Sequence, residues 1–218
     1  MPKLIDLTLT YREGMRGVRF ETARTIEKDG WNAKTLHIYS HAGTHMDAPM
    51  HFNVNDKTID KMPLENCMGN ARVVNLEGIP PKTLITVKDL KEKADHVQPG
   101  DSLILHTGWS HYLNSDLYRD GLPRISDELA HWCCEKKIKM LGVEPPSVAD
   151  VNNIQEVTRI HKLLLEGGVT IIEGLCNLDE LVEEKVLLVA LPLKIFDGDG
   201  APARVIAIEG ADSIPSGS

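Results

Sequence analysis

The chain has 218 residues, enough for one domain with a sizeable core that needs no disulfide or metal to hold it together. Hydrophobic residues make up 42% and charged residues 26%, as in ordinary globular proteins, and the formal net charge of -8 argues against a general nucleic-acid binder. No apolar run is long enough to cross a bilayer, the start of the chain is too charged for a secretory signal, and the four cysteines form no disulfide framework, so we expect a cytoplasmic protein with no nucleic-acid or membrane partner.

The first fifty residues contain two predicted strands separated by a loop. Residues 4–9 alternate between apolar and polar side chains and predict a strand. Residues 12–30 predict an irregular loop, and residues 34–41 alternate again. The second strand leads directly into a histidine-rich segment, residues 41–51, which Gly43 and a following proline predict to be non-helical.

The rest of the chain mixes strands and helices in no regular order. We predict strands at residues 71–76, 102–107, 139–143, 169–173, 186–191 and 204–208. Capping residues, first-turn acids and closing glycines predict helices at residues 86–94, 126–137 and 155–166. This pattern indicates an α/β fold in which a mixed β-sheet core is flanked by helices. Since no linker interrupts the chain, we expect a single domain over residues 1–218.

The densest group of reactive side chains lies between His41 and His51. Three imidazoles, from His41, His45 and His51, and the carboxylate of Asp47 fall within this short segment. Divalent metals bind imidazole nitrogen together with carboxylate oxygen, and a catalytic site keeps one position open for water. Ligands on one tight turn converge with little extra ordering of the chain, so the spacing favours a metal site over a chance cluster of histidines.

Residues 41–52, HAGTHMDAPMHF, resemble the HxGTHxDxPxHF signature of the cyclase family of metal-dependent hydrolases, which includes bacterial kynurenine formamidases and isatin hydrolases. Other segments resemble family segments in family order, namely IDLTLT, HKLLLEGGVTIIEGLCNLDEL and ALPLKIFDGDGAPARVIAI. The resemblance covers effectively the whole chain. It implies the swivelling β/β/α-like fold of that family.

The resemblance also implies a binuclear metal site whose residues transfer one by one. His41 and His45 would hold the first ion, and Asp47 would lie between the two. His161 would hold the second ion, and Glu173 would bridge both. The predicted helix and strand that carry His161 and Glu173 follow one another, and such a pair can present one side chain each to a common cleft. The two divalent ions would be zinc, with manganese as the alternative.

Three further assignments concern proton transfer and substrate. The resemblance implies that His51 donates and accepts protons, as suits an imidazole, with completion of a metal shell as the alternative. Tyr11 lies roughly where kynurenine formamidases have a substrate-contacting tryptophan, and it is predicted to bind substrate. Arg12, Arg16 and Arg19 replace a Pro-Gly-Asp pattern of those enzymes. Their loop is either solvated or a surface for an anionic substrate.

We therefore predict a metal-dependent hydrolase that cleaves a small amide with metal-activated water, most closely an arylformamidase. A hydrolase of isatin-like cyclic amides or lactones is the alternative. A catalytically inactive metal- or ligand-binding protein is the alternative of another class, and the presence of His51, His161 and Glu173 argues against it. Residues 142–147 differ from the Asp-containing version in relatives, which indicates altered specificity. Because relatives are oligomers, we expect a homodimer or higher homo-oligomer acting on a small-molecule substrate.

Overall fold

The computed structural model of the chain describes residues 1–211, so the end of the domain predicted over residues 1–218 lies outside the described residues. Most strands belong to one eight-stranded sheet with the order β1-β12-β11-β5-β7-β9-β10-β4. They are β1 (Lys3–Asp6), β4 (His45–Asp47), β5 (Met68–Asn75), β7 (Ser102–His106), β9 (Met140–Val143), β10 (Thr170–Glu173), β11 (Lys185–Pro192) and β12 (Gly200–Glu209). Because β4 also pairs with β12, the sheet closes on itself.

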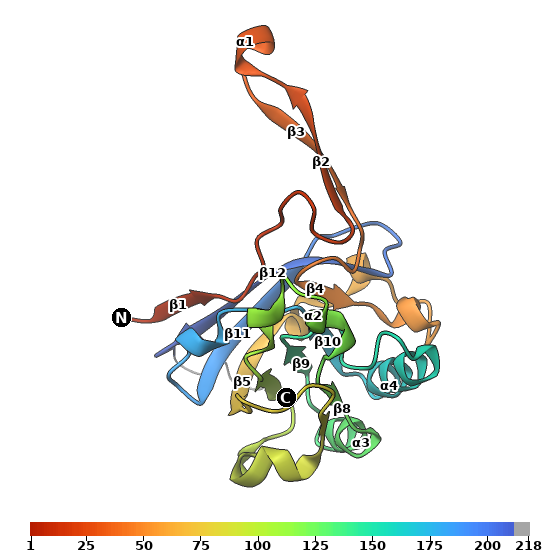
Figure 1. The fold of residues 1–218 in the computed structure, drawn as a ribbon. Helices are drawn as coiled ribbons and strands as arrows, with labels where there is room; N and C mark the ends of the chain where they lie inside the picture. The colour runs from red at the N-terminus through yellow and green to blue at the C-terminus, as the bar shows by residue number, and fades with distance from the viewer. Residues whose placement is uncertain (212–218) are drawn as a thin grey trace.

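The sheet is mixed. Its strands β5, β7, β9 and β10 run parallel, and antiparallel pairs join the others. Parallel neighbours need crossover connections, and two of these carry helices: α3 (Asp127–Glu135) precedes β9, and α4 (Ile154–Glu166) precedes β10. These two helices contact each other and lie on the same side of the molecule (Figure 1). The structure confirms the predicted α/β fold with a mixed sheet and flanking helices.

Apolar side chains of the central strands fill two separate cores. Leu103 and Leu105 of β7 join the core that lies beneath the helices, whereas Ile104 between them joins the core on the other face of the sheet. Successive strand residues point to opposite faces, so a strand that is apolar throughout is covered on both sides. The second core includes Met46 of β4, which anchors the histidine-rich segment to the interior.

Local capping explains where the two long helices begin. The Ser126 hydroxyl accepts the N–H of Leu129 at the start of α3, and the Asn153 side chain accepts the N–H of Glu156 at the start of α4. The helix predicted at residues 86–94 is instead a 3-10 helix over Val87–His96, interrupted at Lys91 by a non-helical backbone conformation (φ 50°, ψ -141°). Its capping box is present, but Leu90 is its sole buried residue among those described, so little packing favours a continuous α-helix.

The prediction of an irregular loop over residues 12–30 is wrong for the second half of that range. Residues Val18–Arg24 form β2, which pairs with β3 (Ala33–Ile38), and α1 (Ile26–Asp29) lies at the turn. Figure 1 shows this hairpin projecting from the body of the molecule. Nearly all residues of β2 are exposed or half-buried, and apolar and polar side chains alternate only from Val18 to Glu21, so the sequence signal for this strand is weak.

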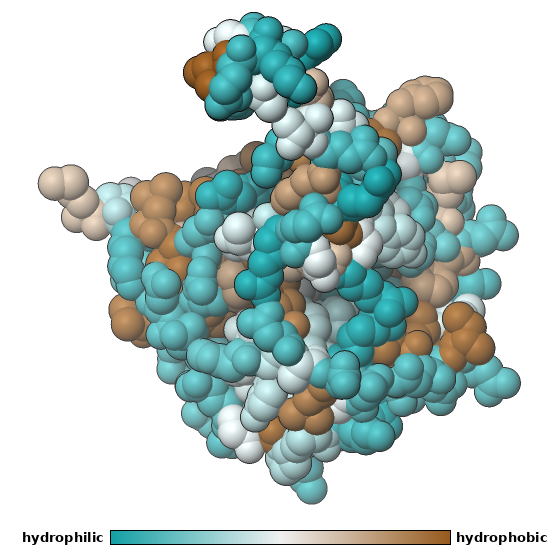
Figure 2. Space-filling view, turned by 45° about the horizontal axis from the view of Figure 1, so that its top comes forward, coloured by the Kyte–Doolittle hydropathy of each residue, from teal (hydrophilic) through white to brown (hydrophobic). Residues whose placement is uncertain are grey.

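The remaining elements are short. They are β6 (Leu84–Ile85) paired with β8 (Arg124–Ile125), α2 (Leu117–Asp120), and 3-10 helices at Pro49–Phe52, Ile59–Lys61, Leu64–Asn66, Trp109–Tyr112 and Leu178–Glu180. Within residues 1–211, each helix is too short or too polar to pass through a lipid bilayer. On the face seen in Figure 2, hydrophobic side chains form separate patches among hydrophilic ones.

Candidate active site

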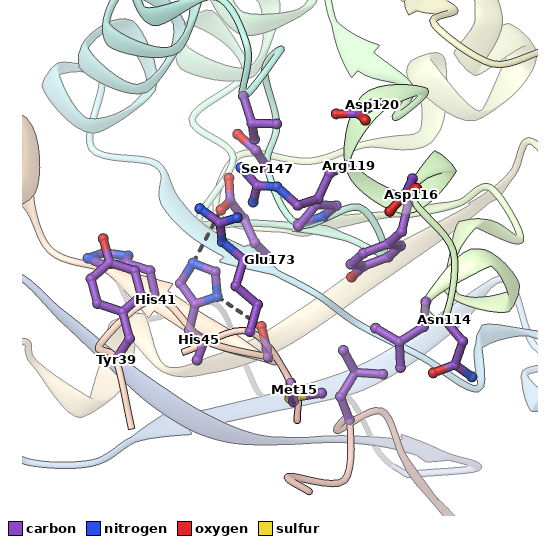
Figure 3. Close-up of a pocket in the computed structure, with 18 of the residues that line it drawn as sticks. Met15, Tyr39, His41, His45, Asn114, Asp116, Arg119, Asp120, Ser147 and Glu173 are labelled. Atoms are coloured by element: carbon purple, nitrogen blue, oxygen red, sulfur yellow. Dashed lines mark hydrogen bonds and ion pairs between the residues drawn. The ribbon is translucent and has the colours of Figure 1, made fainter. Parts of the chain in front are cut away.

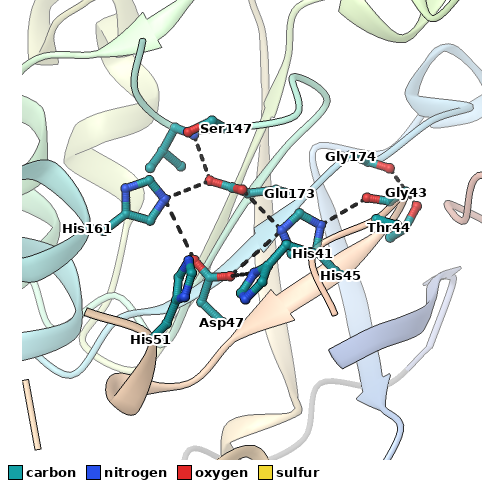
Figure 4. Close-up of polar contacts among 12 residues, drawn as sticks. His41, Gly43, Thr44, His45, Asp47, His51, Ser147, His161, Glu173 and Gly174 are labelled. Atoms are coloured by element: carbon teal, nitrogen blue, oxygen red, sulfur yellow. Dashed lines mark hydrogen bonds and ion pairs between the residues drawn. The ribbon is translucent and has the colours of Figure 1, made fainter. Parts of the chain in front are cut away.

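The pairing of β4 with two neighbours brings distant parts of the chain together. His45 lies opposite Glu173 of β10, and Asp47 lies opposite Gly200 of β12. The helix α4 adds His161, which is buried next to Glu173. The structure therefore gathers the predicted metal-ligating residues from the 41–51 segment, α4 and β10 into one cluster (Figure 4).

Glu173 joins two of the histidines. Its Oε2 lies 3.2 Å from His45 Nε2, and its Oε1 lies 3.1 Å from His161 Nε2. The backbone N–H of Val148 donates to the same Oε1 at 2.8 Å. A carboxylate held on both oxygens keeps one orientation, so the two rings are fixed relative to each other.

Asp47 lies among three imidazoles. Its Oδ1 is 2.9 Å from His41 Nδ1 and 3.7 Å from His45 Nε2, and its Oδ2 is 3.7 Å from His161 Nε2. Asp47 is 1% exposed. It is thus the shared neighbour of the two predicted halves of the site.

Backbone carbonyls orient two of the rings. The Nδ1 of His45 lies 3.0 Å from the carbonyl oxygen of Gly43, and the Nδ1 of His161 lies 2.7 Å from that of Val157. When Nδ1–H donates to a carbonyl, the neutral ring carries its lone pair on Nε2. In both residues Nε2 is the atom directed at the carboxylates, so these rings are arranged as ligands.

The Gly-Thr pair of the motif holds its loop in place. The hydroxyl of Thr44 accepts the N–H of Leu9 at 2.8 Å and donates to the carbonyl of Gly174 at 2.5 Å. Gly43 has a positive φ of 60°, and a Cβ there would lie 3.1 Å from the ring of Tyr11. Only glycine adopts this conformation at low cost in so small a space.

Tyr11 lies behind this loop. Its hydroxyl is 2.6 Å from the carbonyl oxygen of Ala42 and 3.1 Å from that of Thr44, and burial raises the pKa of Tyr11 to about 12. These contacts brace the motif from outside the cavity described below. The substrate contact assigned to Tyr11 stays a prediction.

His51 lies near the mouth of the cluster. The motif, predicted to be non-helical, forms β4 and then the 3-10 helix Pro49–Phe52, in which proline occupies the first turn and His51 follows. The His51 ring stacks on that of His41, with 3.8 Å between centroids, and its side chain is 24% exposed. His51 thus has more access to solvent than the rings beneath it.

Asp199 belongs to the same cluster, and sequence reasoning missed it. Its Oδ2 lies 3.1 Å from His41 Nε2 and 3.5 Å from His51 Nδ1, and it immediately precedes β12. The signal available was the polar run 197–200, Asp-Gly-Asp-Gly, inside a segment already seen to resemble the family. Nothing local shows that this turn meets residues 41–51, because the β4–β12 pairing brings them together.

The pKa of His51 and the pKa values of the deeper rings, His45 and His161, shift in opposite directions. Burial lowers the pKa of His161, but the Glu173 carboxylate outweighs it and the pKa is raised; the same holds for His45. Burial alone would raise the pKa of Glu173, yet hydrogen bonds from both rings hold it well below its ordinary value. Burial lowers the pKa of His51, and the nearby Asp47 does not restore it. The pKa of His51 is therefore shifted in the opposite direction from the pKa values of His45 and His161.

Comparisons with known proteins give the family. The Cyclase family model matches residues 5–150. Kynurenine formamidase of Erythrobacter litoralis is 30% identical, covering 97% of this chain and 96% of its own, and that of Bacillus mycoides is 32% identical, covering 86% and 85%. The chain belongs to the cyclase family of metal-dependent hydrolases.

Solved structures agree with that family. A potential metal-dependent hydrolase with cyclase activity matches this cyclase-family chain with a TM-score of 0.77 at 27% identity, over 97% of this chain and all of the other. Isatin hydrolase A from Labrenzia aggregata has a TM-score of 0.85 at 22% identity, over 95% and 93%. This second similarity is one of fold.

The residues of this cyclase-family site fit divalent cations. The Oδ2 of Asp47 is buried and has no hydrogen-bond partner among the described residues. A buried carboxylate oxygen without a partner is costly, and a cation would satisfy it. Two groups have ligand atoms within 4.8 Å of one another and share Asp47: it joins His41 and His45 in one, and His161 and Glu173 in the other. A third such group joins His41, His51 and Asp199.

A cavity of about 1070 Å³ opens over the cluster. His41, His45, His51, His161 and Glu173 lie on its inner surface. Its other walls come from residues 12–16, 113–120 and 146–152. Pockets for small molecules range up to about 1,000 Å³, so this volume admits an aromatic substrate with substituents. The cavity therefore connects the cluster of this cyclase-family member to solvent.

Proposed function

We propose that this cyclase-family protein is an arylformamidase-like hydrolase, which cleaves a small formamide into an acid and an amine. The observation that carries the proposal is the buried Asp47 carboxylate among three histidines, beneath a cavity of substrate size; its Oδ2 has no hydrogen-bond partner among the described residues. Kynurenine formamidases at about 30% identity over most of the chain support the bond type.

Two divalent ions are proposed for the site. His41, His45 and Asp47 would hold one, and Asp47, His161 and Glu173 would hold the other. Imidazole with carboxylate suits zinc first and manganese as the alternative. When bound, such ions supply hydroxide at neutral pH, because they lower the pKa of water.

His51 is proposed as the proton carrier. It lines the cavity, and its lowered pKa leaves the ring neutral at pH 7 and ready to accept a proton. It would take the proton of the attacking water and return it to the departing nitrogen, so that the amine leaves neutral. Asp199 would orient the rings of His51 and His41 through its contacts with both.

Hydrolysis of an isatin-like cyclic amide is the second candidate function, and the fold similarity to isatin hydrolase A favours it. A cyclic amide needs the same hydroxide and the same proton transfer, but its product stays in one piece. Assembly as a homodimer or larger homo-oligomer, a cytoplasmic location, a part in tryptophan catabolism and a single domain over residues 1–218 stay predictions.

The test strips the protein of metal, reloads it with Zn²⁺ or Mn²⁺, and measures turnover of N-formylkynurenine and of isatin. We expect hydrolysis of the formamide and about two ions per chain. A His51→Ala variant should lose about 10²- to 10⁴-fold in kcat. The matched control is His37→Ala, because His37 lies on the β2–β3 hairpin and contacts Glu21.

Each outcome has a separate meaning. Fewer than about one ion per chain after purification without chelators would contradict the site itself. Turnover of isatin alone would replace the first candidate by the second. Full activity of the His51→Ala variant would remove the proton-carrier role and leave the metal site in place.

A further inference from the structure

The arginines near the cavity differ in what they contact. Arg19 pairs with Glu21 on the hairpin at 2.7 Å and does not line the cavity. Arg12 lines the cavity and donates to the side chain of Asn114. The structure thus removes Arg19 from the anion-binding surface considered from sequence and leaves two of the three arginines.

A third arginine reaches the same cavity from a distant segment. Arg119 of α2 lines it together with Arg16, although about a hundred residues separate them in sequence. Figure 3 shows Arg119 extending from the α2 segment into the cavity, on the side that faces His45 and Glu173. Among the described residues, the side chains of Arg16 and Arg119 form no ion pair or hydrogen bond, although the backbone N–H of Arg119 donates to the carbonyl of Asp116.

The two guanidinium groups are close enough to repel each other. Partial burial, and then the positive charge of Arg16, lower the pKa of Arg119, and the neighbouring Asp120 offsets them in part. A guanidinium stays charged at any pH at which the protein is folded. Two unpaired like charges in one cavity destabilise the free protein, and a bound anion relieves that repulsion.

The carboxylates that line the cavity do not form ion pairs with these two arginines. The Glu13 carboxylate accepts the N–H of Phe20, and the Asp120 carboxylate accepts from the side-chain amide of Asn152. Glu173 is engaged at the inner end by two histidines. Asp116 also lines the cavity, and neither arginine forms an ion pair with it. Arg16 and Arg119 are therefore guanidinium groups on the cavity wall whose side chains have no carboxylate partner among the described residues.

We propose that Arg16 and Arg119 form the anion-binding end of the substrate cavity and determine its specificity for amides that also carry a carboxylate. Guanidinium groups match carboxylates in shape and charge and bind them by paired hydrogen bonds. The carboxylate would bind at the arginines while the scissile amide lies at the histidine cluster. The inference rests on the proposed amide hydrolysis and names the residues that recognise the carboxylate of the substrate.

The first experiment compares N-formylanthranilate with formanilide, which is the same formamide without the carboxylate. We expect the metal-loaded protein to prefer the carboxylate substrate in kcat/KM. Arg119→Gln and Arg16→Gln should each lower kcat/KM for that substrate about tenfold to a hundredfold, mainly through KM, and should lower it for formanilide by a much smaller factor, so that the preference for the carboxylate substrate is lost. The control is Arg24→Gln, since Arg24 pairs with Asp29 at the hairpin tip.

The second experiment needs no catalysis. Binding of benzoate to the metal-free protein is measured by calorimetry, with aniline as the neutral comparison. Wild type and Arg24→Gln should bind benzoate equally, and Arg119→Gln should bind it at least tenfold more weakly. Thermal unfolding of each variant checks that it is folded.

The two experiments distinguish failure of the inference from failure of the function. Equal hydrolysis of both formamides, with no effect of the arginine variants, would overturn the anion site and leave amide hydrolysis standing. Arginine-dependent benzoate binding without turnover of either formamide would support the anion site and overturn the formamidase proposal. Absence of both would overturn both.

Discussion

Replacement of Glu144 tests how the cavity wall is supported. Glu144 follows β9 and is 1% exposed. Its Oε2 accepts the N–H of Thr107 at 2.6 Å, the hydroxyl of Thr107 at 2.9 Å and the N–H of Trp109 at 3.3 Å, and its Oε1 accepts from Ser110 at 2.9 Å. Its backbone carbonyl accepts the hydroxyl of Tyr118 at 2.8 Å. Glu144 thus anchors residues 107–118, the segment that leads directly to Arg119.

Two substitutions at this position should differ in cost. In Glu144→Gln one oxygen still serves Thr107 and Trp109, and the amide donates to Ser110, so mainly the charge contribution to the hydrogen bonds is lost, about 1–2 kcal/mol. Glu144→Ala leaves the Thr107 N–H buried without an acceptor and opens a cavity, which together cost about 3–5 kcal/mol. The Trp109 N–H keeps a 3.3 Å contact to the Thr107 hydroxyl.

Urea unfolding followed by tryptophan fluorescence measures both free energies, because Trp109 is buried in this network. Glu135→Ala, at an exposed position of α3, is the control and should change stability by less than about 0.5 kcal/mol. The argument would be refuted if Glu144→Gln were as destabilising as Glu144→Ala, or if Glu144→Ala matched the control.

Three further predictions concern the site and the core. Asp199→Asn should lower kcat about 10- to 100-fold with metal content unchanged, because it removes the carboxylate that orients two histidine rings; kinetics with metal analysis measures both. Activity should persist at pH 7 and fall on acidification below pH 6.5, the ordinary pKa of histidine, because burial holds the pKa of His51 under that value; a pH profile of kcat/KM measures the acidic limb. Burial raises the pKa of the Cys133 thiol, so a thiol reagent should label it slowly until urea unfolds the chain, as mass spectrometry would detect.

The outcomes that contradict these predictions are distinct. An unchanged kcat in Asp199→Asn would show that the contacts of Asp199 with His41 and His51 do not contribute to catalysis. An acidic limb centred above pH 6.5 would mean that a group other than neutral His51 controls the rate. Rapid labelling of Cys133 in the folded protein would mean that α3 opens readily, and the half-buried Cys134 on the same helix gives the comparison.

Part of the site could be predicted because its signals are local. Three histidines and an aspartate fall within the 41–51 segment, so a metal site can be predicted there without knowledge of the fold. The capped helices and apolar strands were likewise predictable, since each depends on residues a few positions apart. His161 and Glu173 carry no such signal alone, and only the family resemblance identified them.

Tertiary structure alone decided the remaining features, because they depend on pairing between distant segments. The β4–β12 ladder brings Asp199 to His41, and no short-range pattern encodes that ladder. Alternation predicted the second strand of the hairpin at residues 18–38, but the first strand alternates over only four residues and buries only Val18, so the sequence did not predict it. Folding also placed Arg119 beside Arg16 and left Arg19 outside the cavity. Sequence by itself determined the metal-type chemistry, whereas the closed sheet determined which charges surround it.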